Sequence, residues 1–169
     1  MEFIQLIKNR YSVRAFKPDL IDDDSLEYIL GASCLAPTAA NRQPFQLIVI
    51  HTNGRQEELR KIYDKPWFTQ APIVICAVGF PTKAWTRIDN KNYMDVDVAI
   101  AMDHLILAAS ELNIGTCWVA AFDPIAARKV LNIPDDAEPI VFTPLGYPAD
   151  QPKRKIRKSL DEIVLYEKM

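Results

Sequence analysis

Apolar residues occur along the chain in short continuous runs and in helix-spaced stripes. Residues 46–51 (QLIVIH) and 73–80 are apolar and rich in β-branched side chains, which predicts two strands. The second run is apolar throughout, so we expect a strand that is buried on both faces. Residues 116–119, which follow Gly115, and residues 140–145 predict two further short strands.

Helical spacing and helix-end signals predict five helices, over residues 2–9, 25–35, 54–63, 92–112 and 123–131. Asp24 and Glu27 have the spacing of a capping box for the second of them. Asp123 followed by Pro124 is typical of a helix start. The stretch 92–112 is apolar around most of its circumference, as in helices that are buried in a core or a subunit interface.

Helices and strands alternate, and helices predominate. There is no internal repeat, low-complexity tract or linker, so we expect one domain of the α+β class with layered helices and strands. Periodicity alone does not choose the strand order. Residues 149–158 are rich in proline and charge and are predicted to be extended, and IVLY at 163–166 is predicted to be a short terminal strand.

Composition narrows the classes of protein. Of the 169 residues, 49% are hydrophobic and 25% are charged, which is the ordinary mix of a soluble protein. The longest apolar run, Ile73–Phe80, is too short to span a bilayer, and no segment looks like a secretory signal. Together with an odd cysteine count of 3, this favours a cytoplasmic protein.

Two families of site motif are excluded. No two of the 5 glycines lie within about twenty residues of each other, which excludes a GxGxxG fingerprint and a phosphate-binding P-loop. The histidines and cysteines lack the short spacings of zinc ligands, so we expect no metal site.

Basic residues are concentrated in two places. The net charge is −2, yet residues 8–17 and 153–158 carry nine basic residues and no acidic one. The rest of the chain is strongly acidic, whereas a nucleic-acid-binding protein would be basic more broadly. Two local clusters on an acidic protein favour a small anionic ligand, and the alternative is that both are solvated surface runs.

The first cluster has the pattern of a phosphate clamp. Arg10, Ser12 and Arg14 alternate in RYSVRAF, and alternate side chains of an extended backbone point the same way. Arginine donates in bidentate fashion to phosphate oxygens, and serine adds a neutral donor. Lys155 and Arg157 repeat this spacing far along the chain. Ordinary surface arginines are the alternative, and sequence alone does not bring the two segments together.

A polar loop follows the second predicted helix. Residues 37–45 (PTAANRQPF) offer Thr38, Asn41 and Gln43, and amides suit an aromatic ring that has carbonyl and NH edges. The alternative is an irregular loop whose polar groups bond to their own backbone.

Other reactive residues have structural explanations. Cys34, Cys76 and Cys117 lie in apolar surroundings and are predicted to fill the core rather than act as nucleophiles. His104, in the 92–112 helix, is predicted to be a core or interface residue. Trp67 and Trp85 flank a variable region and either line a substrate pocket or simply pack.

Taken together, RYSVRAF, PTAANRQPF and KIRKSLDEIV resemble the nitroreductase family of FMN-dependent oxidoreductases in order and spacing. APIVICAVG and DVDVAIAMDHLILAASELNIGTCW are similar to that family too, so the resemblance covers almost the whole chain, as a compact member. It implies a three-layer sandwich with a mainly antiparallel sheet flanked by helices. It also implies a single FMN-binding domain over residues 1–169 in a homodimer, with residues 149–169 as an arm whose terminal strand is exchanged between subunits.

The resemblance also implies site residues. The phosphate and ribityl contacts are Arg10, Tyr11, Ser12, Arg14, Lys155 and Arg157. The loop that packs on the flavin ring, often from the other subunit, provides Pro37, Thr38, Ala39, Asn41 and Gln43. The segment whose backbone faces the ring near N5 is Trp118, Val119, Ala120 and Ala121. Some members have Glu-Gly at positions 120 and 121, so no carboxylate role carries over.

The function implied is electron transfer from NADH or NADPH through FMN to nitroaromatics, quinones or similar small acceptors. The cofactor supplies the chemistry, so no catalytic side chain is required, and reductant and acceptor use one open ring face in turn. An alternative is a flavin-binding or storage protein, or a flavin-modifying relative, with little NAD(P)H turnover. A third is a non-enzymatic module that binds an anionic ligand or RNA. For the first we expect no nucleic-acid or membrane partner.

Overall fold

The computed structural model describes residues 2–169. Four strands form an antiparallel sheet in the order β1-β2-β4-β3. The strands are β1 (Phe45–His51), β2 (Ile73–Gly79), β3 (Gly115–Thr116) and β4 (Glu138–Gly146). The helices are α1 (Phe3–Asn9), α2 (Asp23–Cys34), α3 (Gln56–Ile62), α4 (Met94–Glu111), α5 (Pro124–Leu131) and α6 (Leu160–Ile163). Two 3₁₀ turns, η1 (Ala39–Asn41) and η2 (Pro66–Phe68), were not predicted.

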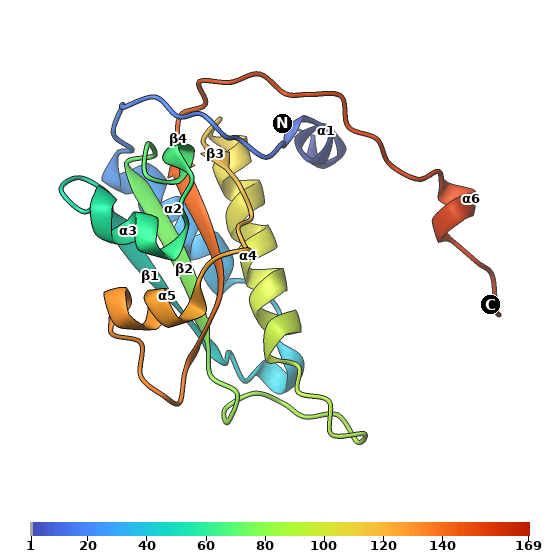
Figure 1. The fold of residues 1–169 in the computed structure, drawn as a ribbon. Helices are drawn as coiled ribbons and strands as arrows, with labels where there is room; N and C mark the ends of the chain where they lie inside the picture. The colour runs from blue at the N-terminus through green and yellow to red at the C-terminus, as the bar shows by residue number, and fades with distance from the viewer. Residues whose placement is uncertain (1) are drawn as a thin grey trace.

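Helices cover both faces of the sheet, as Figure 1 shows, with α2 and α4 on one side and α3 and α5 on the other. Alternate residues of β2 enter the two layers: Ile75 packs with the α2–α4 side and Cys76 with the α3–α5 side. Every residue of β2 is buried, as its continuous apolarity predicts. The α+β three-layer sandwich with an antiparallel sheet is therefore confirmed.

Helix ends agree with the sequence in one case and differ in another. Asp123 accepts hydrogen bonds from the backbone N–H groups of Ile125 and Ala126 at 2.9 and 3.0 Å, so the predicted cap of α5 is confirmed. The predicted Asp24 cap of α2 is wrong, because Asp22 accepts from the Ser25 N–H at 2.8 Å. Each of the three successive aspartates 22–24 could cap the helix, and the helix begins directly after the first of them, Asp22.

An extended N-terminal segment, residues 10–17, runs beside β3 and the end of β4. The Val13 N–H donates to the Thr116 carbonyl at 2.9 Å, and the Ala149 N–H donates to the Ala15 carbonyl at 2.8 Å. Gly115 permits this approach, because a Cβ there would lie 2.7 Å from the Val13 side chain. The start of the chain and residues 147–150, far apart in sequence, are thereby joined.

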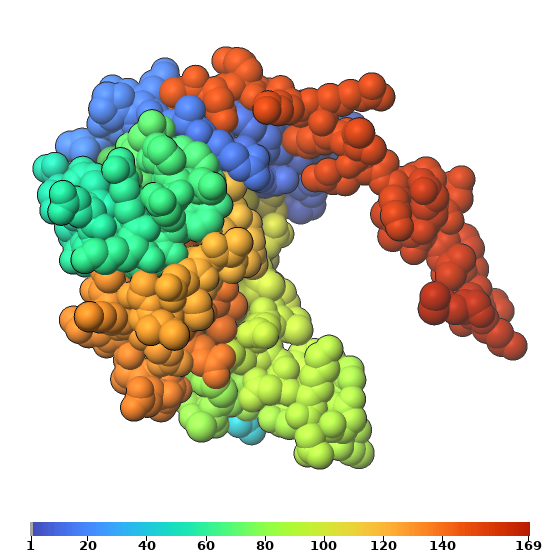
Figure 2. All heavy atoms as spheres, in the orientation of Figure 1, coloured from blue at the N-terminus to red at the C-terminus, as the bar shows by residue number. Residues whose placement is uncertain are grey.

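The C-terminal arm, residues 151–169, leaves the rest of the molecule (Figures 1 and 2). The strand predicted at 163–166 does not form within this chain, because Ile163 ends α6 and no described residue of the arm pairs in a sheet; its exchange with a partner subunit stays a prediction. A four-residue strand needs a sheet edge to join, and in this chain the arm pairs with none. Leu160 is 71% and Tyr166 is 84% exposed. Within residues 2–169, no helix is long and apolar enough to cross a membrane.

Candidate functional site

The two basic clusters meet at one cavity of about 210 Å³. Its lining is Arg10, Tyr11, Ser12, Arg14, Asp150, Gln151, Lys153, Lys155 and Arg157. All six residues that the resemblance assigns to the phosphate and ribityl contacts are in this set. The structure therefore answers the question that the sequence left open, because the two segments do come together, and we call this lining the basic cavity.

The alternation of Arg10, Ser12 and Arg14 follows from how the N-terminal segment docks. Ser12 forms a parallel bridge with Thr116, and Val13 between the polar positions is buried. Burial of Val13 on one side leaves its neighbours facing the other way, toward the basic cavity. The sequence argument from alternate positions holds here for a physical reason.

Asp150 is a member of the basic cavity that the sequence analysis missed. Its carboxylate accepts from the Arg14 N–H at 2.8 Å and from the Tyr11 hydroxyl at 3.2 Å, and its carbonyl accepts from the same hydroxyl at 3.0 Å. Burial, and then the charge of Asp150, raise the pKa of Tyr11 above its ordinary value. Tyr11 therefore remains a neutral donor whose hydroxyl is engaged by the protein.

Lys155 fastens the arm to the end of α1. Its ammonium donates to the carbonyl oxygens of Lys8 and Arg10, which are free acceptors at a helix C-terminus. Burial, followed by the positive charges of Arg10 and Arg157, lowers the pKa of Lys155. The basic cavity thus holds positive charge that a bound anion would stabilise.

That lowered pKa predicts a pH dependence for a phosphate ligand. A bound phosphate favours the Lys155 ammonium, so binding is strongest below the pKa of Lys155 in the free protein and weakens as pH rises through it. We expect the dissociation constant of a phosphate monoester, measured by calorimetric titration, to rise at alkaline pH. In Lys155→Met this alkaline rise should disappear, and persistence of the full rise in that variant would contradict the assignment.

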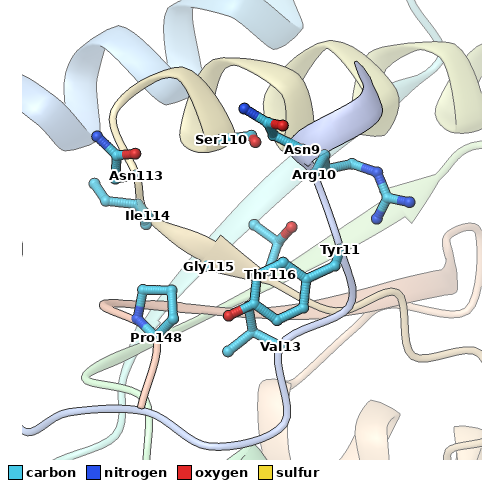
Figure 3. Close-up of a pocket in the computed structure, with 10 residues that line it drawn as sticks. All are labelled: Asn9, Arg10, Tyr11, Val13, Ser110, Asn113, Ile114, Gly115, Thr116 and Pro148. Carbon is cyan, nitrogen blue, oxygen red and sulfur yellow. The ribbon is translucent and has the colours of Figure 1, made fainter. Parts of the chain in front are cut away.

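A second cavity, of about 200 Å³, adjoins the first and shares Arg10 and Tyr11 with it. Its other lining residues are Asn9, Val13, Ser110, Asn113, Ile114, Gly115, Thr116 and Pro148. Figure 3 shows the Tyr11 ring lying across Thr116 and Val13, with the Arg10 guanidinium pointing away from Asn113. Arg10 and Tyr11 therefore form the boundary between the two cavities.

The polar loop 37–43 lies at the other end of α4. The Ala39 N–H donates to Asp97 Oδ1 at 2.8 Å, and Asp97 is in the first turn of α4 and only 1% exposed. Among the described residues, Asp97 Oδ2 is buried without a hydrogen-bond partner. The sequence analysis did not select Asp97, because an aspartate in the first turn of a helix is an ordinary feature.

The loop has an unusual backbone that is held by its own polar groups. Ala40, Asn41 and Gln43 have φ values of 52°, 53° and 48°, a region that side chains other than glycine seldom adopt. Thr38 Oγ1 accepts from the Gln43 N–H at 3.0 Å, and the Gln43 amide donates to Asn41 Oδ1 at 3.1 Å. The loop therefore uses some of the predicted ring-binding groups internally, although Asn41 and Gln43 stay exposed.

Residues 118–121 lie beyond β3 and have mixed exposure. Val119 and Phe142 exchange two backbone hydrogen bonds of 2.9 Å, while Trp118 is 43% exposed. Ala120 and Ala121 are exposed and provide no titratable side chain. Any polar interaction of the pair with a ligand would therefore use the backbone.

The loop and the basic cavity are separated within one chain by the length of α4. The loop bonds to the first turn of this 18-residue helix, and the cavity-lining segment pairs with Thr116 beyond its last turn. At about 1.5 Å per residue, α4 is about 27 Å long. A single chain therefore does not bring all the predicted residues to one place.

Two of the three cysteines lie in the core, as predicted, and the third does not. Cys76 and Cys117 are buried, and burial raises the pKa of both thiols, so they are poor nucleophiles at neutral pH. The predicted core position of Cys34 is wrong, because it ends α2 and is exposed. Trp67 packs edge-on against Tyr63 at 5.6 Å, and Trp85 packs against Tyr93 at 5.2 Å.

The sequence profile of the Nitroreductase family matches residues 7–67 and 59–147. The chain belongs to the nitroreductase family. A crystal structure of a nitroreductase family protein from Clostridium difficile 630 matches it with a TM-score of 0.90 at 36% identity, covering 100% of both chains.

Two named relatives show what this nitroreductase family chain is similar to. One, from Archaeoglobus fulgidus, is provisionally named NADH dehydrogenase/NAD(P)H nitroreductase, is 31% identical and is matched over 89% of this chain and 87% of its own length. The other is the FMN reductase [NAD(P)H] of Bacillus subtilis, 24% identical over 92% of this chain and 70% of its own length. Both alignments extend over most of this chain.

Proposed function

We propose that this nitroreductase family member is an FMN-dependent oxidoreductase that passes electrons from NADH or NADPH to nitroaromatic, quinone or similar small acceptors by a ping-pong mechanism. The observation that carries the proposal is the basic cavity, where two arginine- and lysine-bearing segments converge around a serine hydroxyl. The names of the relatives, an NAD(P)H nitroreductase and an FMN reductase, support the NAD(P)H-dependent class of reaction.

The donor set of the basic cavity fits a phosphate monoester. Arg10, Arg14 and Arg157 can each donate two parallel hydrogen bonds to phosphate oxygens. Lys155 uses two of its three donors on backbone carbonyls and has one left. The Asp150 carboxylate accepts hydrogen bonds from donors of the protein itself, the Tyr11 hydroxyl and the Arg14 N–H.

Bound FMN would supply the redox chemistry, and the residues of this chain would bind and orient it. The basic cavity would hold the phosphate, and the exposed backbone of Ala120 and Ala121 would face the ring. No thiol is required, which agrees with the raised pKa values of Cys76 and Cys117. The protein therefore contributes position and electrostatics rather than a reacting side chain.

A homodimer would complete the site. The outward side of α4 bears Val96, Ala99 and Ile100, which line a shallow, mainly apolar groove together with Asp95, Asp103 and His104. Two α4 helices packed antiparallel along the whole of this side, with their midpoints together, would place the first turn of one, and the loop bonded to it, beside the last turn of the other, which leads to the basic cavity. This arrangement joins the two halves of the predicted site, which the length of α4 keeps apart within one chain.

The test is spectroscopic and kinetic. The purified protein, saturated with FMN, should show a flavin absorption band and should oxidise NADH or NADPH in the presence of a quinone or nitroaromatic. Double-reciprocal plots at several acceptor concentrations should be parallel. A protein that binds no FMN would refute the proposal, and one that binds FMN with only trace turnover would support flavin storage instead.

A further inference from the structure

We propose that Asp150 is a positioning residue for the phosphate site. Its carboxylate binds the start of the C-terminal arm to the N-terminal segment, and this contact orients Lys155 and Arg157 toward the basic cavity. The inference rests on the FMN-binding function proposed above. It concerns a carboxylate, which is an unexpected group in the lining of an anion site.

Asp150 is the last link in a series that joins the two segments. The Lys17 N–H donates to the Tyr147 carbonyl and the Ala149 N–H to the Ala15 carbonyl, both at 2.8 Å. Asp150 continues the series by side chain, accepting from the Arg14 N–H at 2.8 Å. Beyond it, residues 151–154 are exposed and make no backbone pairing in the described chain.

The arm is attached again at Lys155, through the bonds of one side chain. Burial and two positive neighbours disfavour the ammonium that bonds to the α1 carbonyls. Without the Asp150 carboxylate, the segment before Lys155 would be held only by the backbone pairing up to Ala149 and by the Tyr11 hydroxyl on the carbonyl of residue 150, and the arm would sample more conformations. Arg157 lies two residues further on and is exposed. When the arm moves, the Arg157 side chain would no longer be held toward the basic cavity.

Two physical effects of Asp150 on an anion have opposite signs. As a negative charge in the cavity lining, it repels phosphate, so its removal would strengthen FMN binding. As the fastener of the arm, it preorganises two cations, so its removal would weaken FMN binding. Both carboxylate oxygens are already engaged by N–H and O–H donors, which favours the second effect. Whether FMN affinity rises or falls when Asp150 is removed therefore decides between repulsion and preorganisation.

The experiment compares FMN with riboflavin, which lacks the phosphate. In Asp150→Ala we expect FMN to bind about 10- to 100-fold more weakly, which is about the value of one hydrogen bond to a charged group, with riboflavin affinity unchanged. Asp150→Asn keeps one acceptor oxygen and should fall between wild type and Asp150→Ala. Asp136→Ala, an exposed aspartate before β4, is the control with the same change in net charge. Unchanged or tighter FMN binding in Asp150→Ala would overturn the proposal.

A second measurement needs no cofactor. In the protein without FMN, trypsin cleavage after Lys153 and Arg154, relative to cleavage after Lys158, should rise about tenfold in Asp150→Ala, because a released arm opens more often. An unchanged ratio would contradict the fastening role. If the wild-type protein fails to bind FMN, the proposed function fails, while the cleavage ratio still decides whether Asp150 holds the arm.

Discussion

Replacing Arg14 and Arg157 together by alanine should weaken FMN binding by about 10²–10⁴-fold. The two arginines come from the two segments that meet at the basic cavity. Each charge-assisted hydrogen bond that they donate to a phosphate is worth roughly 1.5–3 kcal/mol, and about 1.4 kcal/mol corresponds to a tenfold change in the dissociation constant. Titration of the FMN-free protein, followed by quenching of flavin fluorescence, measures the effect.

A matched control separates this effect from a general loss of positive charge. Arg60→Ala with Lys61→Ala removes two exposed basic residues from the last turn of α3, outside the basic cavity. This double variant should bind FMN like the wild type. Riboflavin should bind the arginine variant and the wild type equally, since it lacks the phosphate. Near-wild-type FMN affinity in the arginine variant would show that the two segments do not share a phosphate.

The layers of the fold could be predicted because each depends on local patterning. The uninterrupted apolar run of β2 requires two covering layers, and the structure provides them. The helix at α4 was also predictable, because it is long and apolar around most of its circumference. Local chemistry also explains the Asp123 cap, whereas the choice of Asp22 over Asp24 depends on where the chain enters α2.

The site was only partly predictable, because it depends on contacts between distant segments. The cations of the basic cavity have a visible spacing in the sequence, but Asp150 is identified only by its bonds to Tyr11 and Arg14. Likewise, nothing local in the sequence joins Ala39 to Asp97, nor requires a left-handed backbone at Ala40. These features arise when elements that are far apart in the sequence pack against each other, so they cannot be predicted from residue spacing.

Within a single chain the arm does not form the strand that its local pattern predicts. Ser159 and Glu162 form a capping box that begins α6, with the Ser159 N–H donating to Glu162 at 2.8 Å, and only Ile163 of the run IVLY belongs to this helix. The apolar residues of IVLY are exposed in this chain. Burial of this surface therefore requires a second molecule, and in our proposal that molecule is the other subunit.

Deletion of residues 159–169 should therefore abolish both the dimer and FMN binding at micromolar concentration. The truncated chain keeps Lys155 and Arg157 but loses Leu160, Ile163 and the residues after them. Burying each large apolar side chain is worth about 1.5–3 kcal/mol, so the arm loses its anchor on the partner. Ordering the freed basic segment then costs about 1–2 kcal/mol per fixed residue, which counts directly against phosphate binding.

Two further variants test whether the effect comes from the apolar residues of the arm. The full-length variant with Leu160→Ser and Ile163→Ser keeps the arm's length but removes apolar contact, and it should behave like the truncation. Deletion of Lys168 and Met169 alone should change neither property, because it leaves α6 and Leu165 in place. Sedimentation at several concentrations gives the dimer, and the flavin band of the sedimenting species gives the cofactor. A truncated chain that sediments as a dimer saturated with FMN would show that the arm neither joins the subunits nor completes the phosphate site.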